Sequence, residues 1–382
     1  MQGLGKMEVK KANVVFLVSS LRGGGSAHDF FMLSPVLLKH AKNRYLFSLS
    51  GLDKRQGGDK EKIFFLDWRS WLDYPYAVIR LARFILRNRI NLVYSTSRCV
   101  NLVSYAACRL SGRPVRMVME EITQPRLRYS LESSFSGWIW QILMAKFYPK
   151  ADLVFCNSES TREELIRWYG CSKERVKLVK NPIPVSDIER RVKGPSDGRT
   201  QAYRPYFITA NRIVRGKGYE ELLTAYALIR EKSKCRLMIA GDGPLFGRIK
   251  KLAVRLGILE DVLFLGWVDD VVPFYKDATA FITASYCEGL SNSLLEAMAA
   301  GVPVVSTRST SWIEDFEKKG ACISVPVGDS AALSKAMIMI ASDETLRRRL
   351  IDNGFKVVAG FREEESAAER DLLLKGVLED FA

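Results

Sequence analysis

The chain has 382 residues, a length typical of two domains of about 150–200 residues each. A hydrophobic content of 47% and a charged content of 26% exclude a disordered, collagen-like or coiled-coil protein. Its apolar runs fall short of the ~20 residues that span a bilayer. The seven cysteines lack the spacing of a zinc site or a disulfide framework.

The net charge of +15 lies entirely in the first half of the chain. Residues 1–180 contain 30 Lys and Arg against 15 Asp and Glu, which leaves 28 of each kind for residues 181–382. A basic half joined to a neutral half predicts an acidic partner for the first half, such as phosphate, nucleic acid or an anionic membrane. An unevenly charged solvated surface is the alternative.

Short apolar segments alternate with amphipathic helices, a pattern typical of parallel sheets covered by helices on both faces. In the first half, strands are expected at residues 13–18, 45–49, 63–66, 92–94, 115–118, 153–156 and 176–179. In the second half, they are expected at residues 206–209, 236–240, 262–265, 280–283 and 302–306. The sequence therefore predicts an α/β protein of two doubly wound, Rossmann-like domains that face each other across a cleft.

The expected boundary between the domains is a polar segment at residues 189–204, rich in glycine, proline and charge, which is typical of a linker. Residues 1–188 would form the N-terminal domain and residues 205–363 the C-terminal domain. A final helix at residues 364–382 could pack back onto the first domain. Ligands of such sheets bind at the carboxyl ends of the strands.

A glycine turn follows the first expected strand. Two lysines precede that strand, as in a secretory signal, but the apolar run is short and ends in LRGGGS instead of a cleavage site. A cytoplasmic protein is therefore expected. The turn contains Gly23, Gly24 and Gly25, and His28 lies just inside the helix that follows. Such a turn lets a ligand approach the backbone at a helix N-terminus, although a glycine turn without a ligand would look the same.

Two cations follow the first strand of the second half. Arg212 comes just after the strand, and Lys217 lies in a glycine-flanked turn before a helix. Cations at the carboxyl end of a strand, beside a helix N-terminus, suit a diphosphate; a solvated turn is the alternative. The next strand ends in AGDGPLFG, residues 240–247, a tight turn and helix start that is expected to be architectural.

Two glutamates lie in the segment EGLSNSLLEAMAAGVPVVST, residues 288–307. Glu288 precedes a glycine turn after a strand and can point toward a ligand. Glu296 lies in a helix of small residues that can pack closely on the sheet. A carboxylate there would accept hydrogen bonds from two ribose hydroxyls, as the acidic residue of dinucleotide-binding folds does. The helix start would offer backbone N–H groups to a phosphate.

Together, and in this order, these segments resemble the retaining nucleotide-sugar glycosyltransferases of family 4, which have the GT-B fold. The matching stretches are VVFLVSSLRGGG, ADLVFCNSESTREEL, VKLVKNPIP, NRIVRGKGYEELLTA, IAGDGPL, VLFLGWVDD and EGLSNSLLEAMAAGVPVV. They extend over nearly the whole chain and are densest at residues 206–307. The resemblance implies a nucleoside-diphosphate sugar as donor, with UDP as the expected carrier.

The resemblance also implies a role for each matching residue. Arg212 and Lys217 would bind the donor diphosphate. Glu288 would contact the transferred sugar, and Glu296 would hold the donor ribose. The glycine loop, with His28, would approach the diphosphate and the acceptor from the opposite domain. The other implied donor contacts are Gly289, Leu290, Ser291 and Asn292, and the backbone of Trp267 and Val268, which would meet the base.

No cofactor or metal is expected, because this family requires no DxD motif and the sequence has none. Lys217, Arg212 and a helix dipole would neutralise the phosphate charge instead. Retention is expected on one face of the sugar, with the leaving phosphate assisting the incoming hydroxyl, because no second carboxylate is evident opposite Glu288. Many relatives carry a histidine in the loop after strand 115–118. This sequence has Glu120 and Glu121 there, so Glu121 becomes a candidate substrate contact, and a solvated loop edge is the alternative.

The acceptor is expected on the basic N-terminal domain. Residues 135–147 (FSGWIWQILMAKF) form an aromatic helix with basic neighbours, which can lie in a membrane interface; core packing is the alternative. We therefore expect a saccharide or lipid-linked acceptor, and a peripheral enzyme on the cytoplasmic face of the bacterial inner membrane that builds surface polysaccharide. Nucleic acid is not expected as a partner, because the basic residues are dispersed and no reader motif is present.

Two other functions fit part of the pattern. Another GT-B enzyme, such as a nucleotide-sugar epimerase or a phosphorylase, would share the cleft but not the segment from Glu288 to Glu296. A non-catalytic subunit that binds a nucleotide sugar would keep Arg212 and Lys217 and release no free nucleotide.

Overall fold

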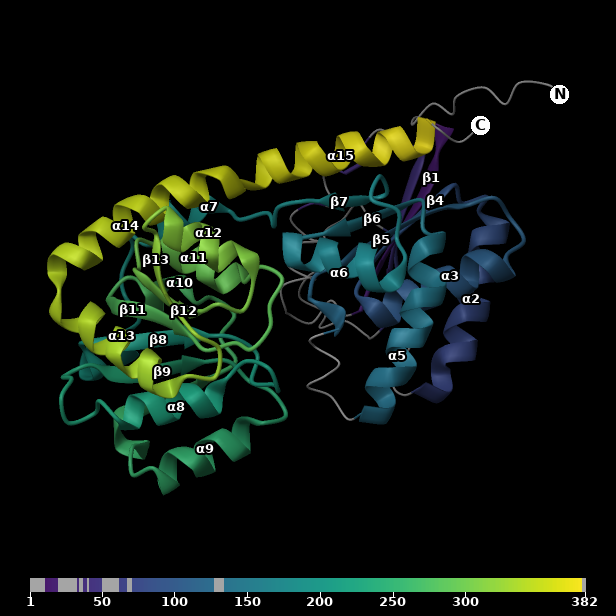
Figure 1. Ribbon diagram of the computed structural model, residues 1–382. Coiled ribbons are helices and arrows are strands. Elements are labelled where there is room, and N and C mark those ends of the chain that lie inside the picture. The colour runs from purple at the N-terminus through teal and green to yellow at the C-terminus, as the bar shows by residue number, and fades with distance from the viewer. Residues whose placement is uncertain are drawn as a thin grey trace. The chain divides into compact units, whose positions relative to one another are not determined.

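The protein divides into two compact units, one of Met1–Pro182 with Glu364–Ala382 and one of Ile183–Glu363. The structure is a computed structural model that describes residues 11–19, 33, 37–39, 41–49, 62–66, 71–126 and 134–379. Each unit is an α/β domain built on a parallel sheet (Figure 1). The glycine loop at Gly23, Gly24 and Gly25 and the nearby His28 lie outside the described residues.

Over the described residues, the sheet of the first unit has the strand order β3-β2-β1-β4-β5-β6-β7. Its strands are β1 (Asn13–Val18), β2 (Asn43–Ser48), β3 (Lys62–Phe65), β4 (Leu92–Thr96), β5 (Arg116–Glu121), β6 (Leu153–Cys156) and β7 (Val176–Leu178). All neighbours run parallel. β1 is buried from Val14 to Val18, because a strand covered on both faces has no solvent side.

Helices cover both faces of this sheet (Figure 1). One face shares a core with α2 (Tyr74–Arg87), α3 (Arg98–Leu110), α5 (Ser134–Phe147) and α6 (Glu159–Tyr169). The opposite face packs against the C-terminal helix α15 (Glu363–Glu379), which buries Ala367, Leu374 and Leu378 there. The last helix of the chain therefore completes the first unit rather than the second.

A buried ion pair holds α15 on this sheet. Arg370 exposes only 1% of its surface. Its Nη2 donates to Glu120 Oε1 at 3.1 Å, and its Nη1 donates to the carbonyl oxygen of Lys180 at 2.5 Å. The hydroxyl of Tyr94 donates to Glu120 Oε2 at 2.6 Å, and burial together with the Glu120 charge raises the pKa of Tyr94 well above its ordinary value. The carboxylate of Glu120 thus has a donor on each oxygen.

Among the residues that the structure describes, the sheet of the second unit has the order β10-β9-β8-β11-β12-β13, again all parallel. Its strands are β8 (Tyr206–Ala210), β9 (Arg236–Ala240), β10 (Val262–Gly266), β11 (Ala278–Thr283), β12 (Val304–Thr307) and β13 (Cys322–Val325). β13 was not expected from the sequence. It is a four-residue edge strand whose short apolar run gives little signal.

The helices of the second unit also lie on both faces of their sheet. One face packs against α7 (Val185–Arg191), α10 (Val272–Tyr275), α11 (Asn292–Ala299) and α12 (Ser311–Lys318). The other packs against α8 (Tyr219–Ala227), α9 (Phe246–Arg255) and α13 (Ser330–Ser342), while α14 (Glu344–Val358) contributes to both cores. In the described parts of both units, every helix falls short of the length and apolar character needed to cross a bilayer.

Local sequence signals place the helix ends. Ser158 Oγ accepts a hydrogen bond from the Thr161 N–H at the start of α6, and Gly170 ends that helix with a φ of +70°. Asp329 and Asp343 begin α13 and α14 by the same side-chain capping. These are the residue types that satisfy the unpaired backbone groups of a helix end.

The segment expected to be a linker belongs to the second unit. Residues 189–204 contain the end of α7 and a 3-10 helix, Gly198–Tyr203, and the unit begins earlier, at Ile183. Val185 and Ile188 of α7 are buried in the core of that unit. Two apolar side chains one turn apart are enough to dock a short helix, although the surrounding composition is polar.

Candidate functional site

The strand order of the second unit reverses between β8 and β11, which lie side by side. At such a switch point, the loops that leave two neighbouring parallel strands diverge and leave room for a ligand. β8 leads into Arg212 and Lys217, and β11 leads into Glu288. The fold therefore brings together the two segments that the sequence indicates as donor-binding.

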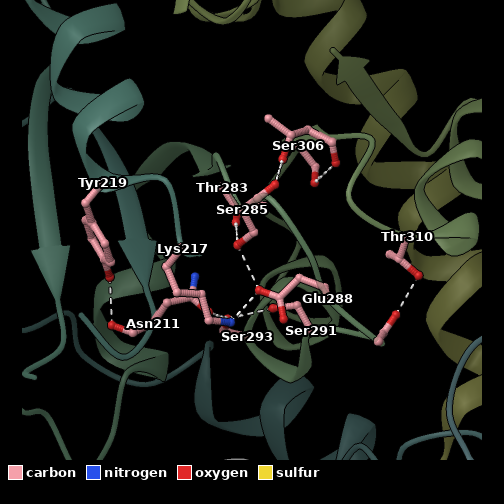
Figure 2. A network of polar contacts seen from close by, with 12 residues as sticks. Asn211, Lys217, Tyr219, Thr283, Ser285, Glu288, Ser291, Ser293, Ser306 and Thr310 are labelled. Carbon is pink, nitrogen blue, oxygen red and sulfur yellow. Dashed lines mark hydrogen bonds and ion pairs between the residues drawn. The ribbon is translucent and has the colours of Figure 1, made fainter. Parts of the chain in front are cut away.

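An ion pair joins these two loops. Lys217 Nζ contacts Glu288 Oε1, and Ser285 Oγ donates to the same oxygen at 2.8 Å (Figure 2). The two charged side chains expose 22% and 12% of their surface, respectively. Two donors on one carboxylate oxygen restrict the Glu288 rotamer, and the charge-assisted bond is the stronger of the two. An ammonium and a carboxylate are thus held at one point of the sheet edge.

A close backbone approach makes this ion pair possible. The Tyr286 N–H donates to the carbonyl oxygen of Gly216 at 2.8 Å. Gly218 has a φ of +65°, and a Cβ at this position would lie 1.9 Å from the carbonyl oxygen of Ala284. Only glycine can adopt that φ while its backbone lies so close to the Ala284 carbonyl group. The glycine that follows Lys217 is therefore explained by the contact between the two loops.

The loop after β12 supports Glu288 from another direction. The Glu288 N–H donates to the carbonyl oxygen of Ser309 at 3.2 Å. The hydroxyl of Thr310 donates to the carbonyl oxygen of Gly289 at 2.6 Å (Figure 2). The loop that contains Glu288 is thus held on both sides, by the Lys217 turn and by the loop after β12. These contacts restrict the position of the Glu288 carboxylate.

Arg212 is placed differently from Lys217. Its side chain is exposed and makes no hydrogen bond or ion pair with the part of the chain that the structure describes. Its backbone is supported by the AGDGP turn, where a Cβ on Gly241 would lie 2.0 Å from the carbonyl oxygen of Asn211, and Ile213 N–H donates to the carbonyl oxygen of Asp242 at 2.9 Å. That turn is architectural, and the guanidinium is not part of the Lys217–Glu288 cluster.

The turn from Glu288 into α11 contains the predicted phosphate contacts Gly289, Leu290, Ser291 and Asn292. Ser291 is the N-cap of α11, and its side chain makes no capping hydrogen bond to the helix. The Ser291 and Ser293 hydroxyls lie 3.1 Å apart, and Ser293 Oγ donates to Asn211 Oδ1 at 3.1 Å (Figure 2). The helix start and the end of β8 are thereby joined by side chains.

Glu296 lies farther along α11 and is half-buried. Burial raises the pKa of its carboxyl to about 7, with Asp270 adding to the rise and Arg191 opposing it. Asp270 and Arg191 form an ion pair with each other. The predicted ribose contact is therefore a carboxyl that changes its charge near neutral pH.

The loop after β10 holds the predicted base contact. Val268 is partly buried against the core, whereas Trp267 is exposed. The indole N–H of Trp267 donates to Asp269 Oδ1 at 2.8 Å. The same loop contains Asp270, whose charge acts on Glu296. The predicted base and ribose contacts therefore lie in one electrostatic neighbourhood.

In the first unit, Glu120 and Glu121 are not in a loop, as the sequence led us to expect, but are the last residues of β5, where both are buried. Glu121 Oε2 accepts from the Tyr148 hydroxyl at 2.7 Å, and Oε1 accepts from the Thr123 hydroxyl at 3.0 Å. Both carboxylate oxygens of Glu121 are thus engaged in hydrogen bonds within the protein. The alternative interpretation of Glu120 and Glu121 as a solvated loop edge is wrong, because β5 extends through both residues and both are buried.

Sequence reasoning missed several residues that position the site. Ser285 and Thr310 support the glutamate loop, Asn211 joins it to β8, and Thr307 Oγ1 donates to the carbonyl oxygen of Ser285 at 2.6 Å. Hydroxyl residues at strand ends are common, so their types carry little signal. Ser285, three residues before Glu288 and two residues after the end of β11, is the one with the clearest sequence context.

The positive groups at this edge include the Lys217 ammonium, the Arg212 guanidinium and the N-terminal end of α11. These are the groups that could hold a diphosphate. Across the described ranges, no three His, Cys, Asp or Glu side chains gather as a metal site would need.

Two family models match the chain. Residues 37–187 match the model described as Glycosyltransferase Family 4, and residues 196–357 match the model described as Glycosyl transferases group 1. The two matches fall one on each structural unit, apart from their ends.

Curated proteins of similar sequence include bacterial glycosyltransferases. One is N-acetylgalactosamine-N,N'-diacetylbacillosaminyl-diphospho-undecaprenol 4-alpha-N-acetylgalactosaminyltransferase of Campylobacter jejuni, 25% identical over 279 residues, which cover 73% of this chain and 74% of that protein. Another is the lipopolysaccharide core biosynthesis glycosyltransferase LpsE of Rhizobium meliloti, 29% identical over 232 residues, which cover 60% of this chain and 65% of LpsE.

Solved structures share the fold over almost the whole chain. Sucrose-phosphate synthase of Thermosynechococcus elongatus aligns with a TM-score of 0.79 and 18% identity, covering 96% of this chain and 99% of that one. HepE of Anabaena in complex with UDP-glucose aligns with a TM-score of 0.76 and 19% identity, covering 95% and 99%. With both family models matched and the GT-B fold shared, the chain belongs to the family 4 glycosyltransferases.

Proposed function

We propose that the protein transfers a hexosyl or N-acetylhexosaminyl group from a UDP-sugar to a saccharide or lipid-linked acceptor, with retention and without a metal ion. The Lys217–Glu288 ion pair at the β8–β11 switch point carries this proposal, because it holds a cation and a carboxylate where a sugar diphosphate would bind. UDP is favoured because the similarly folded HepE was solved in complex with UDP-glucose.

The chemistry follows from the charges. When the bond between the anomeric carbon and the β-phosphate oxygen breaks, negative charge grows on the diphosphate and the sugar becomes oxocarbenium-like. Lys217, which Glu288 holds in place, would stabilise the leaving diphosphate, and the exposed Arg212 would turn toward it. Glu288 would offset the positive charge of the sugar.

Retention requires attack from the face that the leaving group occupies. In the proposed step, the acceptor oxygen forms its bond to the anomeric carbon as the phosphate departs, and the acceptor proton passes to a β-phosphate oxygen. A double displacement would instead need a carboxylate nucleophile on the opposite face of the sugar. The carboxylate of Glu121, the candidate in the first unit, is held by Tyr148 and Thr123.

We also propose that the acceptor belongs to bacterial surface-polysaccharide assembly, at the cytoplasmic face of the inner membrane. Two observations support this. The Campylobacter relative is named for a diphospho-undecaprenol substrate, and the Rhizobium relative for lipopolysaccharide core synthesis. Trp138, Ile139 and Ile142 of α5 are exposed, whereas a helix used only for core packing would bury them.

Nucleoside diphosphate release from a panel of UDP-, GDP- and ADP-sugars, with and without undecaprenyl-diphosphate saccharides, tests the reaction. The Glu288→Ala variant should lose transfer while its UDP affinity stays within a few-fold of the parent. Glu314→Ala, an exposed glutamate on α12, is the matched control and should remain active. Parental turnover in Glu288→Ala would contradict the proposed role of Glu288.

Product analysis separates the alternatives. NMR of the product should show the donor's anomeric configuration, and chelation by EDTA should leave turnover unchanged. An epimerase would yield an altered sugar without a new glycosidic bond, and a binding subunit would retain UDP-sugar affinity with no release of UDP for any acceptor.

A further inference from the structure

The first unit contains a long segment without any carboxylate. From Tyr74 to Met119 the sequence has eight arginines and no Asp or Glu, although the whole chain has 43 acidic residues. This segment includes α2, β4 and α3. The acidic residues that follow, Glu120 and Glu121, are buried with donors of their own. Helices α2 and α3 of this layer are therefore positive. α6 of the same layer has two arginines and three glutamates.

Helix α2 exposes an apolar stripe among its arginines. Tyr76 exposes 58% of its surface, Ile79 41% and Leu86 53%. Arg83 and Arg87 are exposed on the same side, at the three- and four-residue spacing that puts side chains on one helix face. The opposite face, from Ala77 to Ile85, already fills the core of the unit. The exposed apolar side chains thus lie outside that core.

A second helix of the same layer has the same character. In α5, Trp138 exposes 60% of its surface, Ile139 and Ile142 are exposed as well, and Lys146 is the charged residue of the last turn. α5 has no acidic residue. α3 packs against both α2 and α5 (Figure 1). The two exposed apolar stripes therefore belong to one helical layer.

We propose that α2 and α5 form a docking surface for an anionic lipid bilayer. Helices that lie in a membrane interface combine aromatic and aliphatic side chains with Arg or Lys and lack acidic residues on that side. A nucleic acid would use the arginines but leave Tyr76, Ile79 and Leu86 in water. A bilayer uses both, because lipid phosphates pair with guanidinium groups while the apolar side chains enter the acyl boundary.

This proposal rests on the proposed function and deepens it by naming the helices, α2 and α5, that would meet the membrane. The two proposals fail separately. Vesicle binding is measured without any nucleotide, and UDP release from the donor in the presence of a water-soluble acceptor is measured without vesicles.

Co-sedimentation of the full chain with phosphatidylcholine vesicles, with and without phosphatidylglycerol, tests the surface. The parent should bind the vesicles that contain phosphatidylglycerol, and less strongly as salt rises. The R83E/R87E variant should lose at least about tenfold in affinity, since each basic residue near the surface contributes about 1 kcal/mol. The I79S/L86S variant should lose affinity at every salt concentration, because its contribution is apolar.

The matched control is K250E/R255E on α9 of the second unit, where both positions are exposed on a basic helix. It makes the same change in net charge and should alter vesicle affinity by less than about threefold if docking is confined to the first unit. An equal loss in this control, equal binding to phosphatidylcholine alone, or no binding by the parent would each overturn the docking surface.

Discussion

The side chains of Lys217 and Glu288 are each held in place by the charge of the other residue. The ammonium would be a mobile surface cation without the carboxylate, and the carboxylate would be a nearly buried anion without the ammonium and the Ser285 hydroxyl. Since a buried charge is costly unless it is paired, the pair keeps both side chains ordered. In the proposed reaction, this order would let the cation stabilise the leaving diphosphate without first reorganising.

Removing the Lys217 ammonium should therefore slow catalysis more than it weakens binding. We expect Lys217→Met to lower kcat about 10²–10³-fold, the usual effect of removing one preorganised donor to developing negative charge. Lys217→Arg should recover part of the rate, because it restores the charge with a different shape. Steady-state UDP release measures both, and an unchanged kcat in Lys217→Met would contradict the role of this cation.

Glu296 predicts a pH dependence of nucleotide binding. Its pKa is raised from an ordinary 4.5 to about 7, so the carboxyl is mostly protonated at pH 6 and mostly ionised at pH 8. A ribose held by two hydroxyl donors needs the ionised form. UDP affinity should rise up to about tenfold between these pH values through this group. Calorimetric titration of the parent and of Glu296→Gln checks this, because only the parent should show the additional rise.

The same shift has an opposite consequence for stability. Between pH 4.5 and 7 the folded protein holds a proton on Glu296 that the unfolded chain has released. The contribution of Glu296 to stability is thus retained at low pH and lost as pH rises through about 7. Glu296→Gln should raise the unfolding temperature at pH 8 and leave it nearly unchanged at pH 5. A gain of equal size at both pH values would contradict a raised pKa.

At the scale of elements, two loop contacts rather than helix positions bring the site together. α8 and α11 each begin beside the switch point, but the separation between their loops is set by Gly218 against Ala284 and by the Tyr286–Gly216 hydrogen bond. Close backbone approach of this kind depends on a missing side chain. It is therefore sensitive to a single methyl group.

Gly218→Ala should separate the two loops. The left-handed φ alone costs an alanine about 1–2 kcal/mol, and the contact with the Ala284 carbonyl adds strain of roughly 1–3 kcal/mol. Gly112→Ala is the matched control, because Gly112 has a φ of +66° with no atom within 4 Å of the added Cβ. Chemical unfolding and UDP release should both show a larger loss for Gly218→Ala. Equal losses would mean that the close approach is unimportant.

At the scale of the whole molecule, the last helix of the chain is part of the first unit. Arg370 of α15 reaches Glu120 at the end of β5, 250 positions away in the sequence, and also bonds the carbonyl oxygen of Lys180. Lys180 lies just before the chain enters the second unit at Ile183. The buried charges therefore tie together the segments where the chain leaves the first unit and where it returns.

Breaking this buried pair should be expensive. Arg370→Met leaves the Glu120 charge buried beside Tyr94, and we expect a loss of about 3–5 kcal/mol in the free energy of unfolding of the first unit. The exposed pair Arg348–Glu344 provides the control, since Arg348→Met should cost less than about 1 kcal/mol. Adding Glu120→Gln to Arg370→Met should restore part of the loss. Urea unfolding measures all three, and no difference from the control would contradict the structural role of Arg370.

Much of the fold follows from local patterns. The apolar segments at 13–18 and 236–240 coincide with β1 and β9, because a strand buried on both faces must be apolar throughout. The sequence pattern does not indicate β13, because an apolar run of four residues gives little signal. It predicts a linker at residues 189–204, because a short polar element resembles a loop in composition. Such elements are stabilised by their neighbours rather than by their own sequence.

Part of the candidate site can also be predicted from the sequence, and part cannot. The glycine-flanked Lys217 turn and the segment from Glu288 to Glu296 are visible in the sequence, because strand-turn-helix junctions have distinct residue types. The bond between Lys217 and Glu288 is not, because it joins positions 71 residues apart. Glu121 shows the same limit: its sequence context suggests a loop, and only the structure reveals the tyrosine and threonine that hold its carboxylate.

By itself, the sequence determined the two parallel sheets, the basic character of the first unit and the segments that meet at the switch point, since periodicity, charge and turn chemistry are properties of neighbouring residues. Only the tertiary structure decided which charges pair, which carboxyls are buried and which apolar side chains remain exposed. Those outcomes depend on distances and solvent access between distant segments, and these exist only once the chain has folded.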